Sequence, residues 1–406
     1  MLTQEQNELI CKVGPGTPGG DWFRRYWIAA GYSADFKPGG QPRAVRLLGE
    51  DLVMFRGDDG RVGLLGLRCS HRLTSLAYGR AEDGGLRCPF HGWVYDVNGH
   101  CIDQPAEPEG STFKEKIRHP AYPCEELGGV IFAYMGPLEQ KPLLPQYEVL
   151  VREDGDRQHY FDISGGNYLQ HLEGAVDTAH FSYLHQFNWS KTKHLVGKFN
   201  TPEMDFEETD WGIRHTSDLP HVAHNNMLRV YTHFFMPAGF MLLRGTFESG
   251  GKEGIVKTQA WFTPIDDATT MRLNVSWAPD LTALRPITDQ MLPGQVTPGG
   301  ANAYDGFERP VTKDYYRDYD NVDTIHGIPM NHFRAQDIMV NESQGDICDR
   351  TLEHLGAQDH IVTLTRKIIL QGIEDVRQGH DPKHIIRDPE LNDIYYVRGP
   401  ELAEHI

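Results

Sequence analysis

Two short stretches of sequence, each pairing a cysteine with a histidine, decide the fold of the N-terminal half of this chain. The first is Arg68-Cys69-Ser70-His71-Arg72, and the second, separated from His71 by 16 residues, is Cys88-Pro89-Phe90-His91-Gly92-Trp93-Val94-Tyr95-Asp96. Thiolates and imidazoles at this spacing converge on one metal centre. Two kinds of centre fit: a tetrahedral zinc site, or an iron–sulfur cluster in which two histidines replace two cysteines on one iron.

The residues around the ligands favour the cluster. Both stretches resemble the Rieske patterns C-x-H and C-x-x-H-G-W, whereas a zinc finger would carry its histidines on one helix. Ser70 stands where the usual C-P-H-R arm has proline, a change that removes no ligand. The resemblance implies a [2Fe–2S] cluster held by Cys69, His71, Cys88 and His91. Neutral imidazoles would raise its reduction potential above that of an all-cysteine ferredoxin.

Composition places the chain among ordinary globular proteins. It has 406 residues, of which 39% are hydrophobic and 24% charged, so we expect two or three domains. A net charge of -18 argues against a nucleic-acid or anionic-membrane partner. Six cysteines are too few for a disulfide scaffold. The sequence has no membrane-spanning apolar run and no signal-peptide pattern, so we expect a cytoplasmic protein.

Strand and turn patterns divide the chain. Short apolar segments separated by turn pairs such as Asp59-Gly60 and Asn98-Gly99 predict a small all-β unit. Longer strands with helices toward the ends follow, which predicts an α+β domain. We therefore expect an N-terminal segment over 1–42, the Rieske domain over 43–136, a linker over 137–150 and a catalytic domain over 151–406.

A second group of metal-binding residue types lies on a predicted helix. Asp177 and His180 are three residues apart and share a helix face. His185 lies five residues further on, about 140° away around an ideal helix, so a helix end or a local widening is needed to bring both imidazoles to one metal. Two histidines and one carboxylate form the facial triad of non-haem Fe(II) enzymes.

The whole chain resembles the catalytic α subunit of Rieske non-haem iron oxygenases, in particular the phthalate dioxygenase branch. The resemblance is carried by the two cysteine–histidine stretches, by residues 167–180, by residues 342–359, and by Gly14-Pro15-Gly16-Thr17-Pro18 and Arg24-Arg25-Tyr26-Trp27. It implies a helix-grip catalytic domain, an antiparallel sheet with helices. It also implies that His180 and His185 bind a mononuclear Fe(II). Asp177 would be the carboxylate that links this iron to His91 of a neighbouring subunit.

The third iron ligand is a carboxylate from elsewhere in the chain. We compared Asp337, Asp346, Asp349 and Asp359. In the family this ligand stands at the start of the long C-terminal helix, so we expect Asp359, with Asp346 as the second candidate. Asp359 would also suit a plain helix N-cap.

The resemblance implies oxidation of an aromatic carboxylate by O2, and we favour cis-dihydroxylation of a phthalate-like acid. The alternatives are an O-demethylating or hydroxylating monooxygenase acting on a methoxylated or phenoxy-substituted aromatic acid, and a non-catalytic Rieske electron carrier or binding protein. An anionic substrate calls for an arginine. We expect Arg244, which stands in an apolar strand, and Arg214, with Arg229 and Arg272 as further candidates.

Partners follow from the same resemblance. The chain has no dinucleotide-binding glycine pattern, so electrons must come from a separate NAD(P)H-dependent flavin and iron–sulfur reductase. The family passes electrons between neighbouring subunits, which implies a homotrimer or a stacked hexamer.

Overall fold

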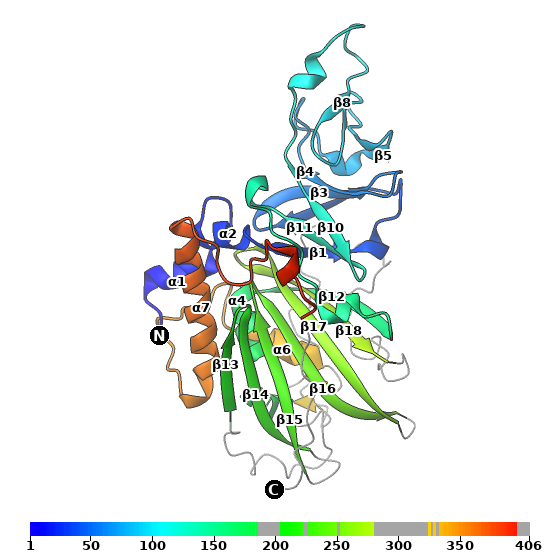
Figure 1. Cartoon of the computed structure of the whole chain (residues 1–406). Helices are drawn as coiled ribbons and strands as arrows, with labels where there is room; N and C mark the ends of the chain where they lie inside the picture. The colour runs from blue at the N-terminus through cyan, green and yellow to red at the C-terminus, as the bar shows by residue number, and fades with distance from the viewer. Residues whose placement is uncertain are drawn as a thin grey trace.

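The fold is dominated by antiparallel sheets. The computed structural model describes residues 1–182, 184–185, 204–221, 226–249, 252–279, 324–325, 328–329 and 333–395. In Figure 1 the small sheets of the N-terminal part lie at one end, and the long strands of a single large sheet lie at the other. Among the described residues, no helix is both long and apolar enough to cross a membrane.

Two four-stranded sheets form the part that carries the cysteine–histidine stretches. They have the orders β2-β3-β4-β9 and β5-β6-β7-β8. Residues such as Phe55, Leu65 and Leu86 are fully buried in a hydrophobic core of their own. The strands are β2 Arg43–Leu47, β3 Glu50–Arg56, β4 Val62–Gly66, β5 Arg80–Glu82, β6 Gly85–Arg87, β7 Val94–Tyr95, β8 Cys101–Asp103 and β9 Ala121–Tyr122.

A three-stranded sheet connects this part to the rest of the chain. Its order is β1-β11-β10, with β1 at Trp27–Tyr32, β10 at Cys124–Leu127 and β11 at Val130–Tyr134. The Tyr32 hydroxyl donates to the Tyr160 carbonyl oxygen at 2.7 Å and also lies 2.9 Å from that of Asn274. The N-terminal helices α1 (Gln4–Cys11) and α2 (Pro18–Phe23) pack against the C-terminal helix α7 (His360–Arg377). Residues before the part that carries the cysteine–histidine stretches thus contribute to both halves of the molecule.

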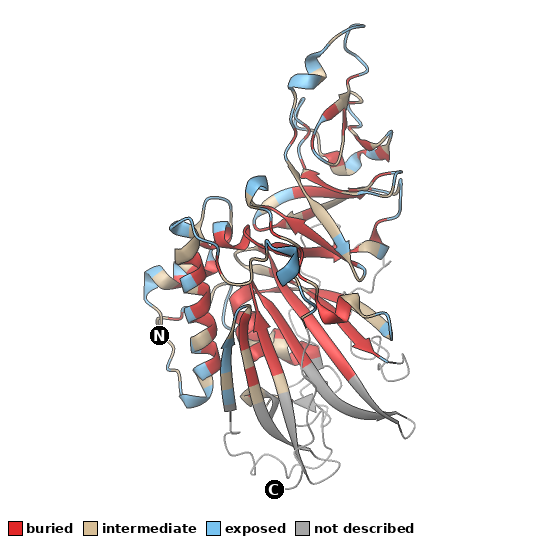
Figure 2. Cartoon of the chain, in the orientation of Figure 1, coloured by how far each residue is buried: buried red, intermediate tan, exposed pale blue. Residues whose placement is uncertain are grey.

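The large sheet has seven antiparallel strands in the order β12-β18-β17-β16-β15-β14-β13. Helices α4 (Tyr168–Val176) and α6 (Phe333–Glu342) contact it, and α7 packs against β14. Most of the described length of these strands is buried (Figure 2). This sheet with its helices confirms the predicted α+β architecture. The strands are β12 Asp156–Gly165, β13 Met204–Thr209, β14 Gly212–His221, β15 Asn226–Phe235, β16 Gly239–Ser249, β17 Lys252–Asp266 and β18 Thr269–Ala278.

Candidate metal centres

The end of helix α4 brings the two catalytic-domain histidines together. Asn167 caps the start of the helix, because its side chain accepts a hydrogen bond from the Leu169 amide at 3.1 Å. At Asp177 the backbone turns extended and the helix ends. The Asp177 carboxylate then accepts from the amides of Ala179 (2.8 Å) and His180 (3.2 Å), which begins a short 3-10 turn. The helix end anticipated from the five-residue spacing is therefore present.

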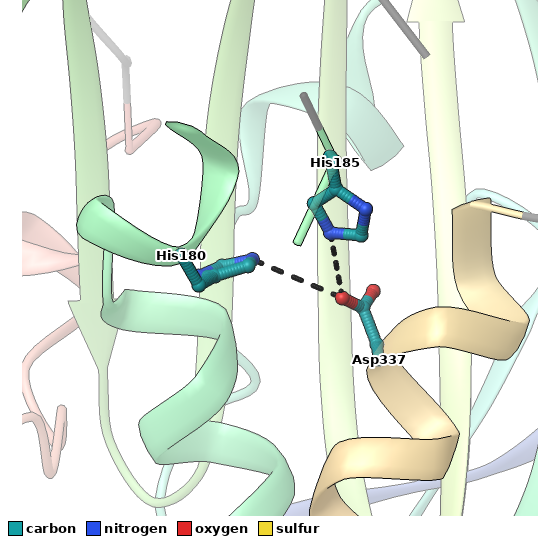
Figure 3. A group of neighbouring side chains, drawn as sticks. All are labelled: His180, His185 and Asp337. Carbon is teal, nitrogen blue, oxygen red and sulfur yellow. Dashed lines mark hydrogen bonds and ion pairs between the residues drawn. The ribbon is translucent and has the colours of Figure 1, made fainter. Parts of the chain in front are cut away.

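His180, His185 and Asp337 form the group shown in Figure 3, with Asp337 contributed by α6. His185 Nε2 lies 2.8 Å from Asp337 Oδ1, and His180 Nε2 lies 3.8 Å from the same oxygen. One ligand atom from each residue lies within 4.8 Å of the others. Adjacent ligands of an octahedral metal with bonds of about 2.1 Å are about 3 Å apart. Two imidazoles and one carboxylate at this spacing fit a mononuclear Fe(II) that keeps positions open.

An acceptor fixes the ring orientation of His185, and a carboxylate lies beside the outer nitrogen of His180. His185 Nδ1 lies 2.8 Å from Oε1 of the buried Gln336, so the ring donates there and presents Nε2 to the group. His180 Nδ1 lies 3.4 Å from Asp177 Oδ2. Burial raises the pKa of the Asp337 carboxyl, but the hydrogen bond from His185 and the charges of both histidines outweigh it and hold that pKa below its usual value. Asp337 is therefore available as an anionic ligand.

Asp359 does not lie in this group, which corrects our expectation for the third ligand. Its carboxylate accepts from the Gly356 amide at 2.6 Å and stabilises the turn that precedes α7. Asp359 occupies the N-cap position of α7, but its side chain makes no capping hydrogen bond to that helix. Asp346, the second candidate, lies after α6, where its carbonyl oxygen accepts from the Asn167 amide at 2.9 Å.

A pocket opens beside the group and holds two further arginines. Arg334, one turn before Asp337 on α6, donates to both oxygens of Asp162 at 3.2 and 3.0 Å. Its Nη1 also lies 3.6 Å from Asp337 Oδ2. The pocket is lined by His171, Gly174, Ala175, His180, Phe240, Leu242, Thr258, Arg272, Arg334, Asp337 and Asn341. It combines apolar walls with positive charge next to the candidate iron site.

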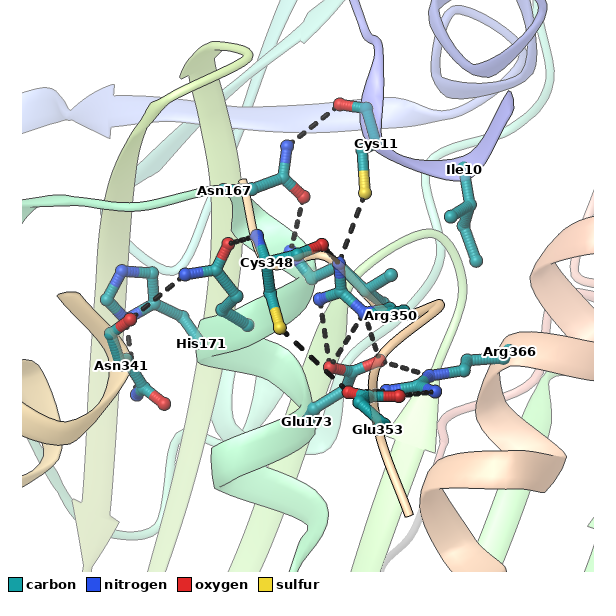
Figure 4. A network of polar contacts seen from close by, with 12 residues as sticks. Ile10, Cys11, Asn167, His171, Glu173, Asn341, Cys348, Arg350, Glu353 and Arg366 are labelled. Atoms are coloured by element: carbon teal, nitrogen blue, oxygen red, sulfur yellow. Dashed lines mark hydrogen bonds and ion pairs between the residues drawn. The ribbon is translucent and has the colours of Figure 1, made fainter. Parts of the chain in front are cut away.

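A buried ion network around Glu173 holds helix α4 in place (Figure 4). Glu173 accepts from Arg350 (2.9 Å) and Arg366 (2.6 Å), and Arg366 also donates to Glu353 at 2.6 Å. Burial raises the pKa of Glu173, but the charges of the two arginines outweigh it and keep that pKa below its ordinary value. Arg350 lies 3.3 Å from the Asn7 carboxamide oxygen, so the N-terminal helix takes part as well. The network fixes the helix whose end presents Asp177 and His180.

The two cysteine–histidine stretches occupy facing loops, one after β4 and one between β6 and β7. Cys69 and Cys88 are buried, and burial, together with the neighbouring Cys69 thiol, raises the pKa of Cys88. The His71 ring is exposed, and its centroid lies 4.5 Å from that of His91. Buried thiols with outward imidazoles fit the two irons of a Rieske cluster.

Hydrogen bonds support the ligand loops from inside. The Tyr95 hydroxyl lies 3.2 Å from Cys69 Sγ. His119 Nε2 lies 2.8 Å from the Gly66 carbonyl oxygen, so the ring donates there and its Nδ1 accepts from the Ser70 hydroxyl at 2.7 Å. Gly92 has a φ of +74°, and a Cβ there would approach Pro105 to 2.7 Å. The second loop therefore requires glycine at this position.

Of the two arginines expected to bind substrate, only Arg214 has a described side chain, and it is not among the residues that line the pocket. Arg214 forms an ion pair with Glu207. The next residue, His215, pairs across the strands with Thr232, which pairs with Leu242, which in turn pairs with Thr258. Leu242 and Thr258 line the pocket, so this face of the sheet is the pocket face. Because side chains alternate along a strand, Arg214 faces the opposite side of the sheet. Arg244 lies on β16 opposite Val256, and its side chain is outside the described residues, as is that of Arg229.

Several residues of the site had escaped the sequence analysis. Gln336 and the Asp162–Arg334 pair were not considered, and Asp337 was weighed but not chosen. The sequence does carry one signal for Asp162. An acidic residue between Phe161 and Ile163 in a strand is unusual in a buried position, so it indicates a buried partner of opposite charge.

Comparison with known proteins identifies both parts of the chain. Residues 26–123 match the Rieske [2Fe-2S] domain family, and residues 133–389 match the family described as LigXa C-terminal domain like.

Similar proteins extend this match over nearly the whole chain. The oxygenase subunit of 5,5'-dehydrodivanillate O-demethylase from Sphingobium sp. is 34% identical over 399 residues, covering 97% of this chain and 85% of that protein. The phthalate 4,5-dioxygenase oxygenase subunit from Pseudomonas putida is 32% identical, covering 93% and 88%. Among solved structures, the terminal oxygenase of carbazole 1,9a-dioxygenase from Nocardioides aromaticivorans has a TM-score of 0.60 at 17% identity, covering 92% and 98%. Dicamba monooxygenase bound to dicamba has 0.65 at 16%, covering 88% and 99%.

The relatives in sequence are oxygenase subunits, so the alternative of a non-catalytic electron carrier is wrong. The solved structures confirm the fold. The chain belongs to the Rieske non-haem iron oxygenases as an α subunit, an enzyme component that carries a [2Fe–2S] Rieske cluster and a mononuclear iron.

Proposed function

We propose that this chain is the terminal oxygenase component that oxidises an aromatic carboxylate with O2. His180, His185 and Asp337 hold the mononuclear iron, and Cys69, His71, Cys88 and His91 hold the Rieske cluster. The observation that carries the proposal is the approach of two imidazoles and one carboxylate to within 4.8 Å beside a pocket. Bound iron supplies the site for reductive activation of O2.

The protein's own residues orient the iron ligands and control the pocket. Gln336 keeps the Nδ1 proton of His185 on the outer side, so Nε2 stays free as a ligand. Asp177 Oδ2 lies 3.4 Å from His180 Nδ1, and its negative charge favours a proton on that outer nitrogen. Because the Asp177 side chain is 26% exposed, it is also open to a neighbouring subunit. We propose that Asp177 accepts a hydrogen bond from His91 of that subunit in a homotrimer or stacked hexamer.

The substrate class is proposed from the relatives. Those named for 5,5'-dehydrodivanillate, 3-chlorobenzoate, phenoxybenzoate and phthalate act, by name, on aromatic acids. Cis-dihydroxylation remains our prediction, in line with the three dioxygenases among them. O-demethylation is a second candidate, because the relative that is 34% identical carries that name. Electrons come from a separate NAD(P)H-dependent reductase, and a cytoplasmic location stays a prediction.

Iron content tests the site assignment. The wild-type holoenzyme should hold three irons per chain, two of them in the cluster. Asp337→Ala should lose the mononuclear iron and all product formation while the cluster absorbance stays unchanged. Asp359→Ala, the matched control, should keep three irons and its activity. An Asp337→Ala variant with full iron and turnover would exclude this ligand set.

Product analysis tests the reaction. Phthalate, 3-chlorobenzoate, 3-phenoxybenzoate and 3-methoxybenzoate are incubated with the enzyme, NADH and a compatible reductase. A cis-diol product supports dihydroxylation, and stoichiometric formaldehyde from the methoxylated acid supports O-demethylation. Consumption of none of these acids, at full iron content, would refute the aromatic carboxylate as substrate.

Electron transfer tests the role of Asp177. Asp177→Asn should leave the cluster spectrum unchanged but slow single-turnover oxidation of the reduced cluster. Oxidation at the wild-type rate would contradict the link through Asp177.

A further inference from the structure

Arg272 is a guanidinium in the pocket beside the candidate iron site. It lies on β18, opposite Asp162 of β12 and Phe262 of β17. Its side chain lines the pocket together with His180 and Asp337. Burial and the charge of Arg334 lower the pKa of Arg272 below its ordinary value, and an arginine nevertheless stays protonated. The pocket therefore contains a permanent cation.

The acid directly opposite Arg272 in the sheet is already engaged. Asp162 is the direct cross-strand neighbour of Arg272, yet both of its carboxylate oxygens accept from Arg334. Among the described residues, no carboxylate forms an ion pair with Arg272, and its Nε is buried without a hydrogen-bond partner. Arg272 is half-buried. A partly desolvated guanidinium without an anion is costly, and a carboxylate that enters the pocket reduces that cost.

The other arginines near the sheet are less suited to this task. Arg334 is held by Asp162 and lies 3.6 Å from Asp337, so its charge is balanced within the protein. Arg214 is paired with Glu207 and faces the other side of the sheet. Of the arginines whose side chains the structure describes, Arg272 is the one that combines a place in the pocket with the lack of an ion-pair partner.

We infer that Arg272 binds the carboxylate of the aromatic substrate, an inference that rests on the proposed function. The Arg272 guanidinium lies 5.6 Å from the centroid of the Phe262 ring, a cation–π contact that holds the planar group in place. Its hydrogen-bonding edge then suits the two oxygens of a carboxylate. Phe240 and Leu242 supply apolar wall for the aromatic ring.

This arrangement selects for charge as well as shape. An acid fixed at Arg272 places its ring in the pocket that His180 and Asp337 also line. Neutral analogues of the same shape lose the charge-assisted contact. The enzyme should therefore prefer free acids to their methyl esters.

Binding of matched ligands tests the inference without relying on turnover. Anaerobic calorimetry of the ferrous holoenzyme compares each acid of the panel above with its methyl ester, for wild type, Arg272→Gln and the control Arg214→Gln. Arg272→Gln should weaken acid binding by about 10- to 100-fold and leave ester binding unchanged. Arg214→Gln should behave as wild type.

The possible outcomes separate this inference from the proposed function. Unchanged acid affinity in Arg272→Gln, or an equal loss for acid and ester, overturns the role of Arg272 even if the wild type oxidises the acids. Failure of the wild type to bind any acid overturns the substrate class itself. If Arg272→Gln fails to load iron, Arg272→Lys decides: a loss confined to the acid supports the inference, and no loss overturns it.

Discussion

The buried ion network behind helix α4 allows a stability prediction with a definite magnitude. The Arg350 side chain is fully buried and donates to Glu173, which also accepts from Arg366. Replacing Arg350 with Met leaves two carboxylates, Glu173 and Glu353, sharing the single guanidinium of Arg366. One negative charge is then buried without compensation. Breaking a buried pair in this way costs about 3–5 kcal/mol of unfolding free energy.

Equilibrium urea denaturation, followed by tryptophan fluorescence, measures this loss, and a double-mutant cycle assigns its cause. Adding Glu173→Gln to Arg350→Met removes the excess charge and leaves Arg366 paired with Glu353. The double variant should therefore be more stable than Arg350→Met alone. Arg80→Met, which breaks an exposed pair with Glu82, should leave the midpoint unchanged. A double variant no more stable than Arg350→Met would refute the electrostatic reasoning and leave lost packing as the cause.

Three further predictions concern the metal centres and the pocket. Gln336→Leu removes the acceptor of His185 Nδ1, so competition with a chelator should show about 10- to 100-fold weaker iron binding; unchanged affinity would exclude the orienting role. Ser70→Ala removes the hydrogen bond to His119, so visible circular dichroism should show faster loss of the Rieske cluster on warming, with Ser70→Thr restoring the wild-type rate. Burial, and next the charge of Arg334, lower the pKa of His171 from 6.5 to about 4, so the unfolded state binds the proton more tightly. The contribution of His171 to stability should then fall by about 3 kcal/mol as the pH drops from above 6.5 to 4. The buried His215, His233 and His384 have lowered pKa values as well, so His171→Gln should lose about 3 kcal/mol less stability than the wild type over this range and keep the rest of the slope.

The residues that sequence reasoning found are those close together along the chain. The cysteine and histidine of each Rieske loop are two or three residues apart, and His180 and His185 are five apart, so their spacing carries the information. Strand periodicity likewise predicted the large sheet, because each strand shows its alternation locally. These features depend on short stretches of backbone.

Asp337 was not chosen, because it meets His185 across 152 residues of sequence. No spacing rule links positions so far apart, and Asp359 offered the more familiar location at a helix start. Arg214 and Arg272 show a second limit. The alternation of side chains along a strand predicts which residues share a face, but it does not predict which face packs against the helices. Only the folded sheet shows that Arg272 lies in the pocket and that Arg214 lies on the opposite face.

The net charge of -18 bears on how an acid reaches Arg272. At long range the acidic protein repels an anionic substrate, and the cation attracts it only within the pocket. Salt screens exposed charges beyond about 10 Å at 0.1 M, whereas a buried contact is screened much less. Raising the ionic strength from low values should therefore increase kcat/KM for an aromatic acid and leave the value for its methyl ester unchanged. A decrease for the acid would show that a local positive surface, rather than the net charge, governs its approach, and it would move the site of charge selection from Arg272 to the entrance of the pocket.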